Sequence, residues 1–271
     1  MSPWLESLAA ALLAVAGFFL GQWFSRRPKP WWLAGYFIPL GLMISYGLAR
    51  RFPPLSFEPP LSWMMMGRNQ YAVIGFIIAM VLSTLLSRLP RRPDRNAVCV
   101  FIIVGVMHSA VWPFLAPAFN RRHLEGLKTR IDGDGICLQS NDYNCGPASA
   151  VTALRRLGLP AEEGQLAILA HTSTATGTPP DILARALSEH YGPDGVRAEY
   201  RPFRNVEELR AAGLTLALVK FSFTLDHWVT VLEVTATDVV VGDPLAGLIR
   251  ESHADFRARW RFVGVVVKRT R

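Results

Sequence analysis

The first 120 residues contain four long apolar stretches, and these constrain the fold more than any other feature of the chain. Each has roughly 20 residues, the length that a helix needs to cross a bilayer core of about 30 Å. Inside a bilayer the backbone must satisfy its hydrogen bonds within the segment, so each stretch is expected to be helical. The predicted spans cover residues 4–24, 31–49, 70–87 and 97–119. We therefore predict an α-helical membrane domain over residues 1–123.

The charged residues are divided unevenly along the chain. Residues 1–130 contain 14 Lys and Arg against 4 Asp and Glu, a net charge of +10, whereas residues 131–271 contain 15 against 17, a net charge of −2. The basic excess therefore lies in short loops between apolar spans, where it directs membrane topology. The polar half has no basic face interleaved with aromatic residues, which argues against nucleic acid as a partner.

The same loops predict an orientation. The first and third loops carry seven Lys and Arg, and the second loop carries three. The positive-inside rule then places loops one and three in the cytoplasm, and the C-terminal half on the exoplasmic side. Arg121 and Arg122, just after the fourth span, favour the opposite orientation. No basic segment or cleavage site accompanies the first span, so we expect an uncleaved anchor.

His108 lies inside the fourth predicted span. An ionisable side chain at membrane depth is a functional candidate by default. The alternative, which we favour, is a neutral histidine bonded to a carbonyl of a neighbouring helix, because no second ionisable residue lies at matching depth.

The C-terminal half alternates predicted helices with predicted strands, after an expected linker over residues 124–137. Helices are predicted directly after Cys145, over 161–171 and 180–191, after Asn205, and over 252–260. Strands are predicted over 197–201, 214–221, 227–234, 239–242 and 262–267. Helices first and an antiparallel sheet second is the order of an α+β domain, predicted here over residues 138–271.

The stretch from Gln139 to Ser149 contains the strongest signal for chemistry. Pro147 is tolerated only in the first turn of a helix, so a helix is expected to begin close to Cys145. A helix N-terminus carries about half a positive charge and free N–H groups, which favours the nucleophilic thiolate. Gly146 is expected to keep the sulfur open to approach. The side-chain amide of Gln139 and the backbone N–H of Cys145 could together form an oxyanion hole.

A thiol nucleophile needs a base, and the base needs a group that orients it. His227 opens a predicted strand and Asp243 ends the next, so two neighbouring antiparallel strands would bring them together. Asp226 is a rival for the orienting role, but adjacent residues of a strand point to opposite faces, which favours Asp243. The other histidines of this half are interpreted as surface residues: His171, His190 and His253.

Taken together, Gln139-x5-Cys145-Gly-Pro-Ala, His227 and Asp243-Pro244 resemble the bacteriocin-processing cysteine peptidases. These papain-like "double-glycine" peptidases occur at the front of certain ABC exporters and as free-standing domains. The segment 176–184 is also similar to the start of that family's middle helix. The resemblance covers about residues 138–268. Asn144 departs from the Asp that usually precedes the cysteine in this family.

The resemblance implies a papain-like fold and a peptide or protein substrate, cleaved after a small pair such as Gly-Gly in a leader. It also implies a multi-pass protein of a bacterial cytoplasmic membrane and a possible separate exporter as a partner. The sequence has no Gly-x4-Gly-Lys-Ser/Thr phosphate loop, so we expect no fused nucleotide-binding domain. Neither a cofactor nor a metal is expected, because no Cys/His cluster has ligand spacing.

The sequence thus predicts a membrane-anchored cysteine peptidase with Cys145 as nucleophile, His227 as base, Asp243 as orienter and Gln139 in the oxyanion hole. Two alternatives remain open. One is a non-catalytic peptide-binding domain on a membrane anchor. The other is an acyl transferase, since hydrolysis and transfer share the same acyl-enzyme.

Three cysteines do not make a disulfide framework. Cys99 lies in an apolar span, and Cys137 is interpreted as a small buried residue before Gln139. A disulfide between Cys137 and Cys145 is the alternative, and it would inactivate the predicted enzyme.

Overall fold

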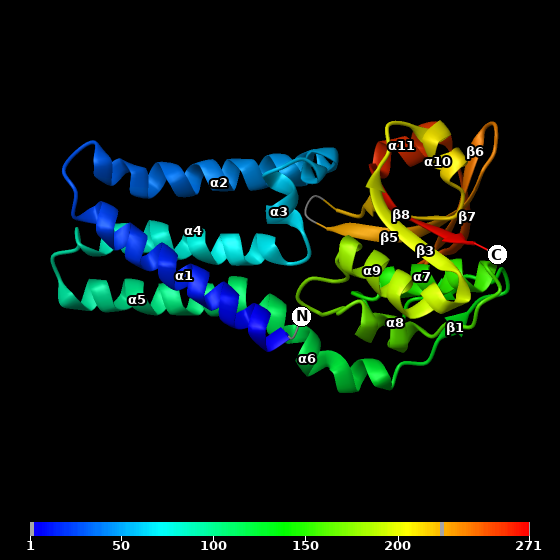
Figure 1. Cartoon of the computed structure of the whole chain (residues 1–271), viewed down its shortest axis with the longest axis horizontal. Coiled ribbons are helices and arrows are strands. Elements are labelled where there is room, and N and C mark those ends of the chain that lie inside the picture. Colours follow the sequence, from blue (N-terminus) through cyan, green and yellow to red (C-terminus); the bar gives the residue numbers. More distant parts are fainter. Residues whose placement is uncertain (1–2, 223–224, 271) are drawn as a thin grey trace. The chain divides into compact units, whose positions relative to one another are not determined.

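The structure is a computed structural model that describes residues 3–222 and 225–270. The chain divides into two compact units, Met1–Ala118 and Phe119–Arg271 (Figure 1). The first unit is helical, and the second has an α+β fold, so the predicted fold class is confirmed for both.

Among residues 3–222 and 225–270, four helices are long and apolar enough to cross a membrane, and all four begin in the first unit. They lie close to the four predicted spans, and the last is longer than predicted, running over Arg92–Glu125. The helical elements of this part of the chain are α1 (Pro3–Ser25), η1 (Trp31–Leu33), α2 (Ala34–Arg51), η2 (Pro53–Phe57), α3 (Leu61–Met65), α4 (Asn69–Leu86), α5 (Arg92–Val106), η3 (Met107–Val111) and α6 (Trp112–Glu125).

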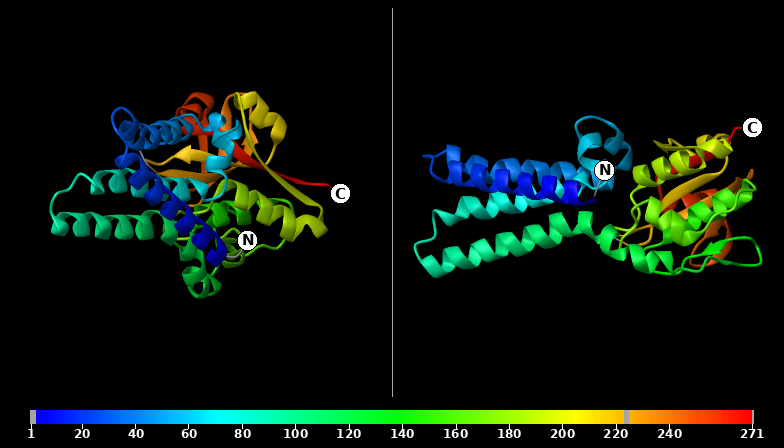
Figure 2. Two further views of the ribbon diagram at one scale, coloured as in Figure 1. Left: turned by 60° about the vertical axis from the view of Figure 1, so that its left-hand side comes forward. Right: turned by 60° about the horizontal axis from the view of Figure 1, so that its bottom comes forward.

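Helices α1 and α4 pack closely, and α4 runs beside α5 (Figure 2). Gly17 and Gly21, four residues apart on α1, make this contact possible. A Cβ atom at Gly17 would lie 2.7 Å from the carbonyl oxygen of Phe76, and one at Gly21 would collide with Met80 and Ser83. Such small-residue spacing is typical of helix pairs in membranes, where close backbone approach replaces the hydrophobic drive of water.

The last apolar helix contains a π-helical turn, η3, just before Pro113. His108 lies in this turn with its side chain exposed. No hydrogen bond from its imidazole to another residue is found in the described part of the chain. The favoured interpretation of His108 as a carbonyl-bonded histidine therefore gains no support from the structure.

The second unit is built on a six-stranded antiparallel sheet with the order β3-β8-β4-β5-β6-β7. Its strands are β3 (Val196–Pro202), β4 (Thr215–Lys220), β5 (Asp226–Val234), β6 (Asp238–Asp243), β7 (Gly247–Ser252) and β8 (Trp260–Arg269). Its helices are α7 (Cys145–Arg156), α8 (Glu163–Leu169), α9 (Pro180–Tyr191), η4 (Gly192–Asp194), α10 (Val206–Ala212) and α11 (His253–Arg259). Strand β7, at one edge of the sheet, was not predicted.

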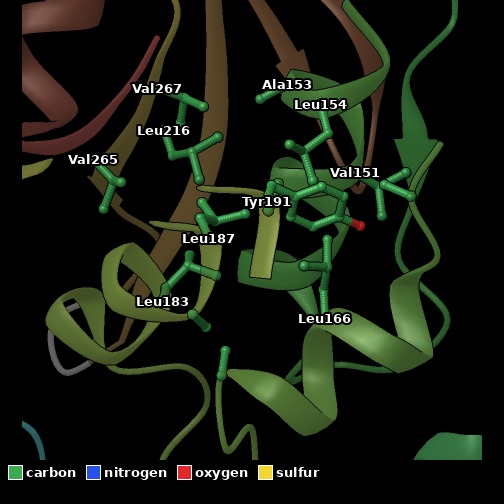
Figure 3. Packing of buried hydrophobic residues seen from close by; sticks show 14 of the residues in the cluster. Val151, Ala153, Leu154, Leu166, Leu183, Leu187, Tyr191, Leu216, Val265 and Val267 are labelled. Carbon is green, nitrogen blue, oxygen red and sulfur yellow. The ribbon is translucent and has the colours of Figure 1, made fainter. Parts of the chain in front are cut away.

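Helices cover both faces of this sheet (Figure 1). On one face α7, α8 and α9 bury a cluster that includes Leu154, Leu187 and Leu216 (Figure 3). On the other face α10 and α11 bury a cluster around Phe256 and Trp260. Strand β4 serves both clusters, because alternate residues of a strand point to opposite faces.

The predicted linker belongs in part to the folded unit. It contains β1 (Arg130–Ile131), which pairs antiparallel with β2 (Cys137–Leu138). Helix α6 also continues to Glu125. The two-residue strands bring the chain to Gln139, at the start of the segment that precedes α7.

Candidate active site

Cys145 is the first residue of α7, as the position of Pro147 predicts. The helix begins with a hydrogen bond from Ala148 N to Asn144 O (3.0 Å). Pro147 lies in the first turn, where its missing N–H has no intrahelical partner to lose. The Cys145 side chain is buried, so the thiol lies at a helix N-terminus inside the unit and not on an open surface.

Gly146 is packed differently from our expectation. It is buried, and a Cβ atom built on it would lie 2.8 Å from Cβ of Thr178. The glycine therefore lets the segment before α9 approach the start of α7. The same segment is held from the other side, where Trp228 Nε1 donates to Thr178 O (3.3 Å). The small size of Gly146 serves packing of the site wall rather than leaving the sulfur open.

His227 and Asp243 meet because β5 and β6 are neighbouring antiparallel strands. His227 Nε2 lies 2.9 Å from Asp243 Oδ1, and both side chains are buried. A carboxylate can only accept, so Nε2 carries the hydrogen. The second ring nitrogen is left for Cys145, which lies close enough to this imidazole to help raise its pKa. Leu245 N donates to the same carboxylate oxygen at 2.8 Å and fixes its position.

The charges of this pair follow from those contacts. Burial alone lowers the pKa of His227, but the hydrogen bonds to Asp243 and Cys145 outweigh it and raise the pKa from 6.5 to about 9. Burial alone raises the pKa of Asp243, but hydrogen bonds from His227 and from Leu245 N lower it below its ordinary value. Near neutral pH the pair is therefore an imidazolium against a carboxylate, and Cys145 lies beside it.

The rival orienter points elsewhere. Asp226 accepts from Arg261 at 2.7 Å, on the other face of β5 from His227. Among the other histidines, His190 is exposed, as expected, and its Nε2 lies 3.1 Å from Gln165 Nε2. His171 and His253 are half-buried, so each still has part of its surface exposed.

Gln139 lies beside this group but holds its side chain within its own loop. Its Nε2 donates to Asn141 O (2.9 Å), and its backbone N donates to Pro244 O (3.0 Å), directly after Asp243. An amide nitrogen has two hydrogens, so one N–H of Gln139 is not used by Asn141. The backbone contact thus joins the loop before Cys145 to the strand end that bears Asp243.

Two residues that the sequence did not reveal hold this loop in place. The fully buried carboxylate of Glu163 accepts from Ser140 N (2.8 Å) and Ser140 Oγ (2.6 Å). Arg130 Nη2 donates to Gln139 O (3.0 Å). Charge-assisted hydrogen bonds of this kind are the stronger ones in proteins. No local pattern distinguishes Glu163 from the neighbouring Glu162, so only the fold shows which of the two is buried.

Phe221 was also missed. Its ring centroid lies 5.8 Å from that of His227, and its side chain is largely exposed. It precedes the turn between β4 and β5, whereas His227 follows it. An exposed aromatic ring beside the imidazole gives the site an apolar border on this side.

Cys137 is fully buried and has a free thiol, as has Cys145, so the structure contains no disulfide between them. Burial, aided by the nearby Glu163 carboxylate, raises the pKa of Cys137 to about 12. Cys137 is therefore an inert thiol at neutral pH. Within residues 3–222 and 225–270, no group of three or more His, Cys, Asp or Glu is placed to hold a metal ion.

Comparison with known families identifies the folded unit. The model of the peptidase C39 family matches residues 134–271, slightly more than half of the chain. The chain belongs to the peptidase C39 family. The resemblance inferred from Gln139, Cys145, His227 and Asp243 is confirmed at this level, and residues 134–271 are the C39 domain.

Relatives and solved structures align with the same half. An uncharacterised protein of Methanothermobacter marburgensis is 32% identical over 124 residues, which are 46% of this chain and 81% of that protein. A second, from Methanothermobacter thermautotrophicus, is 29% identical over 123 residues, 45% of this chain and 80% of that protein.

Among solved structures, a double glycine motif protease from an AMS/PCAT transporter, in complex with the leader peptide, is 17% identical with a TM-score of 0.41. It covers 53% of this chain and 93% of its own. The peptidase domain of Streptococcus ComA is 18% identical with a TM-score of 0.43, covering 49% of this chain and 96% of its own.

Proposed function

We propose that this chain is a membrane-anchored cysteine peptidase in which Cys145, His227, Asp243 and Gln139 form the catalytic site. The observation that carries the proposal is the buried contact of His227 Nε2 with Asp243 Oδ1 at 2.9 Å, on an imidazole whose pKa is also raised by the neighbouring Cys145. A nucleophile, a base and an orienting acid in one chain of contacts is the arrangement that acyl transfer requires.

In the first half of the reaction Cys145 and His227 act as a preformed thiolate–imidazolium pair, in which the thiol proton already lies on His227, and the thiolate attacks the scissile carbonyl carbon. The helix N-terminus and the adjacent imidazolium both favour the thiolate. His227 then donates its proton to the leaving amine, and the C–N bond breaks to leave an acyl-enzyme. Asp243 keeps the imidazole in position and stabilises its charged form.

The developing oxyanion is stabilised by the backbone N–H of Cys145 and by the remaining N–H of Gln139. Each donor of this kind is worth roughly 10²–10³ in rate. In the second half, water loses a proton to His227 and attacks the thioester, and the C–S bond breaks to restore the thiolate–imidazolium pair as the acid product leaves. The reaction as a whole consumes one water and cleaves one peptide bond.

The substrate of this proposal is a peptide with a small-residue, Gly-Gly-like pair at the end of a leader. The family membership of the C39 domain supports a peptide substrate, and the leader peptide bound to one of the similar solved structures suggests the leader. The four apolar helices support a bilayer anchor, and the arginine count supports an exoplasmic position of the C39 domain. An exporter would then be a separate partner.

The test is cleavage of peptides by the purified full-length protein in detergent. Synthetic leader peptides ending in Gly-Gly, each joined to a short cargo, are compared with matched peptides in which the pair is Val-Val. Product masses locate the scissile bond. We expect one cut directly after Gly-Gly, absent with Cys145→Ala and retained with Cys137→Ala.

Three outcomes distinguish the alternatives. Binding of the leader without cleavage would favour a peptide-binding module. A product extended by an added amine, in place of the free acid, would favour acyl transfer. Cleavage that persists in Cys145→Ala would contradict the proposed nucleophile.

A further inference from the structure

The first unit, Met1–Ala118, is called the membrane unit below. It contains a cleft of ≈860 Å³ that the peptidase chemistry does not use. Three helix ends form it: the last turns of α1, the end of α4 and the first turns of α5. Its volume is in the range of pockets that hold a whole small molecule. At the cleft α1 is fixed to α4, because Ser25 Oγ donates to Thr84 O (2.7 Å) and Gln22 Nε2 donates to Ser83 O (3.0 Å). The walls are therefore preformed.

One end of the cleft is cationic. Arg26, Arg27 and Arg95 line it, and all three side chains are exposed. In the described part of the chain, none of these guanidinium groups forms an ion pair with a carboxylate. Arg27 instead lies over the ring of Trp23, 4.4 Å from its centroid. The N-terminus of α5 adds its partial positive charge to the same end.

The remainder of the cleft is apolar. Phe18 and Phe19 of α1 lie about 10–12 Å along the helix axis from Arg26, at 1.5 Å per residue. Leu86 of α4 and Cys99 of α5 line the cleft with them. These side chains belong to the apolar helices, whereas the arginines lie at or beyond the helix ends. The lining thus changes from cationic to apolar along its length.

We propose that this cleft binds one anionic phospholipid. Arg26 and Arg95 hold the phosphate, and an acyl chain lies against Phe18, Phe19 and Leu86. A soluble anion would leave the apolar part of the cleft unused, and a zwitterionic lipid would bring its own cationic head group to the cationic end of the cleft. The proposal rests on the membrane-anchoring part of the proposed function and is independent of its peptidase part.

The arginines also fit the predicted topology. They belong to the first and third loops, which the positive-inside rule places on the cytoplasmic side. Anionic lipids give that surface its negative potential, and each nearby Lys or Arg strengthens lipid binding. The predicted orientation and the position of the cleft therefore agree on the same leaflet.

Native mass spectrometry of the full-length protein in detergent tests the proposal. Phosphatidylglycerol and phosphatidylcholine of the same chain length are titrated separately. We expect one tightly bound phosphatidylglycerol, with R26Q/R95Q lowering its affinity roughly 20- to 30-fold. The matched control is R91Q/R92Q, which removes the same charge from the same end of the unit but from residues outside the cleft lining. It should change the affinity less than about threefold.

Cys99 offers a second readout that does not depend on stability. In a Cys145→Ala background, Cys99 is the partly exposed thiol, because Cys137 is fully buried. Bound phosphatidylglycerol should slow maleimide labelling of Cys99, and glycerol 1-phosphate at the same concentration should not. Protection by glycerol 1-phosphate would mean an anion site and would overturn the lipid proposal.

Equal loss of affinity in R26Q/R95Q and R91Q/R92Q would also overturn it, since the effect would then be diffuse charge. So would equal binding of the two lipids. Carbonate extraction of native membranes separates this failure from failure of the anchor: a protein released by carbonate would lack the anchor on which the proposal rests. Leader cleavage is measured on the same preparations and reports on the peptidase proposal alone.

Discussion

The two units of this chain use apolar side chains in opposite ways. In the C39 domain the largest ones are inside, and Trp260 and Phe256 are at most 1% exposed. In the membrane unit many large ones are outside, with Phe37 63% and Phe101 70% exposed, although Met80 and Phe114 are buried. Its interior contacts are made by small residues such as Gly17, Gly21, Ala79 and Ala110.

This difference is the one expected if water surrounds the C39 domain and lipid surrounds the membrane unit. Water drives large apolar groups into a core, so a water-facing domain loses stability when its core is emptied. Lipid tails are as apolar as a phenylalanine ring, so helices in a bilayer associate through close fit and not through apolar burial. Truncation of a large apolar side chain should therefore cost stability in the core of the C39 domain, whereas truncation of an exposed one should cost little in the membrane unit.

The largest expected effect separates the chemistry from the anchor. Cys145→Ala should lower peptide cleavage by at least about 10⁴-fold, because the nucleophile is lost. It should leave membrane association unchanged, as judged by carbonate extraction. Gly21→Leu should disturb the anchor instead, because the added side chain displaces α1 from α4. The alkylation rate of the Cys145 thiol should stay unchanged. Loss of cleavage in both variants with equal severity would mean that the two units are not separable in this way.

A stability pair comes next. Leu154→Ala empties the core of the C39 domain and should cost about 2–5 kcal/mol. Phe37→Ala removes an exposed ring of α2 and should cost less than about 0.5 kcal/mol in detergent. Hydrogen exchange of the amides in β4, β5 and α4 measures both effects separately in the full-length protein. A cost of Phe37→Ala well above about 0.5 kcal/mol would mean that the ring makes a protein contact, and the two units would then not differ in this way.

The pH dependence should follow the buried pair of the C39 domain. The pKa of His227 is raised to about 9, so its contribution to stability is complete below about 6.5 and is lost as pH rises through about 9. The imidazolium is also needed to protonate the leaving amine, so cleavage should fall above about pH 9.

Asp243→Asn sharpens that prediction. Loss of the carboxylate removes the contact that raises the His227 pKa, and the alkaline limb should move toward the ordinary value of 6.5. A pH–rate profile of kcat/KM for wild type and variant measures the shift. An unchanged alkaline limb would show that Asp243 does not set the charge of His227.

The smallest expected effect concerns Glu163. Glu163→Gln weakens the bonds to Ser140, and the loop bearing Gln139 should lose precision, lowering kcat about tenfold with little change in KM. Alkylation of Cys145 should stay the same, because it needs no oxyanion hole. Glu162→Gln, on the neighbouring carboxylate that accepts from Thr129, is the matched control and should have no effect. Equal effects of the two would mean a role in stability only.

Local patterns determine how much of this structure could be predicted. Apolar length defined the four long helices, and Pro147 defined the start of α7, because both depend on residues within one segment. The pairing of His227 with Asp243 was inferred from strand order, and the structure places them 2.9 Å apart. Their catalytic roles remain predictions.

What was missed depends on contacts between distant segments. Strand β1 has two residues and no periodic pattern, so its pairing with β2 is visible only in three dimensions. Strand β7 alternates exposed and half-buried residues at a sheet edge, which gives a weak signal. Gly146 suggested an open approach to the sulfur, whereas the fold places Thr178 against it. Glu163 is buried by the loop that it holds.

The most direct test of the central claim is the alkylation rate of Cys145 by iodoacetamide across pH, in the full-length detergent-solubilised protein. We expect fast alkylation at pH 7 that is lost in Cys145→Ala, retained in Cys137→Ala and slowed in His227→Ala, because the imidazolium stabilises the thiolate. A Cys145 that reacts no faster than an ordinary exposed thiol, with no change in His227→Ala, would contradict the cysteine peptidase and leave a peptide-binding domain in its place.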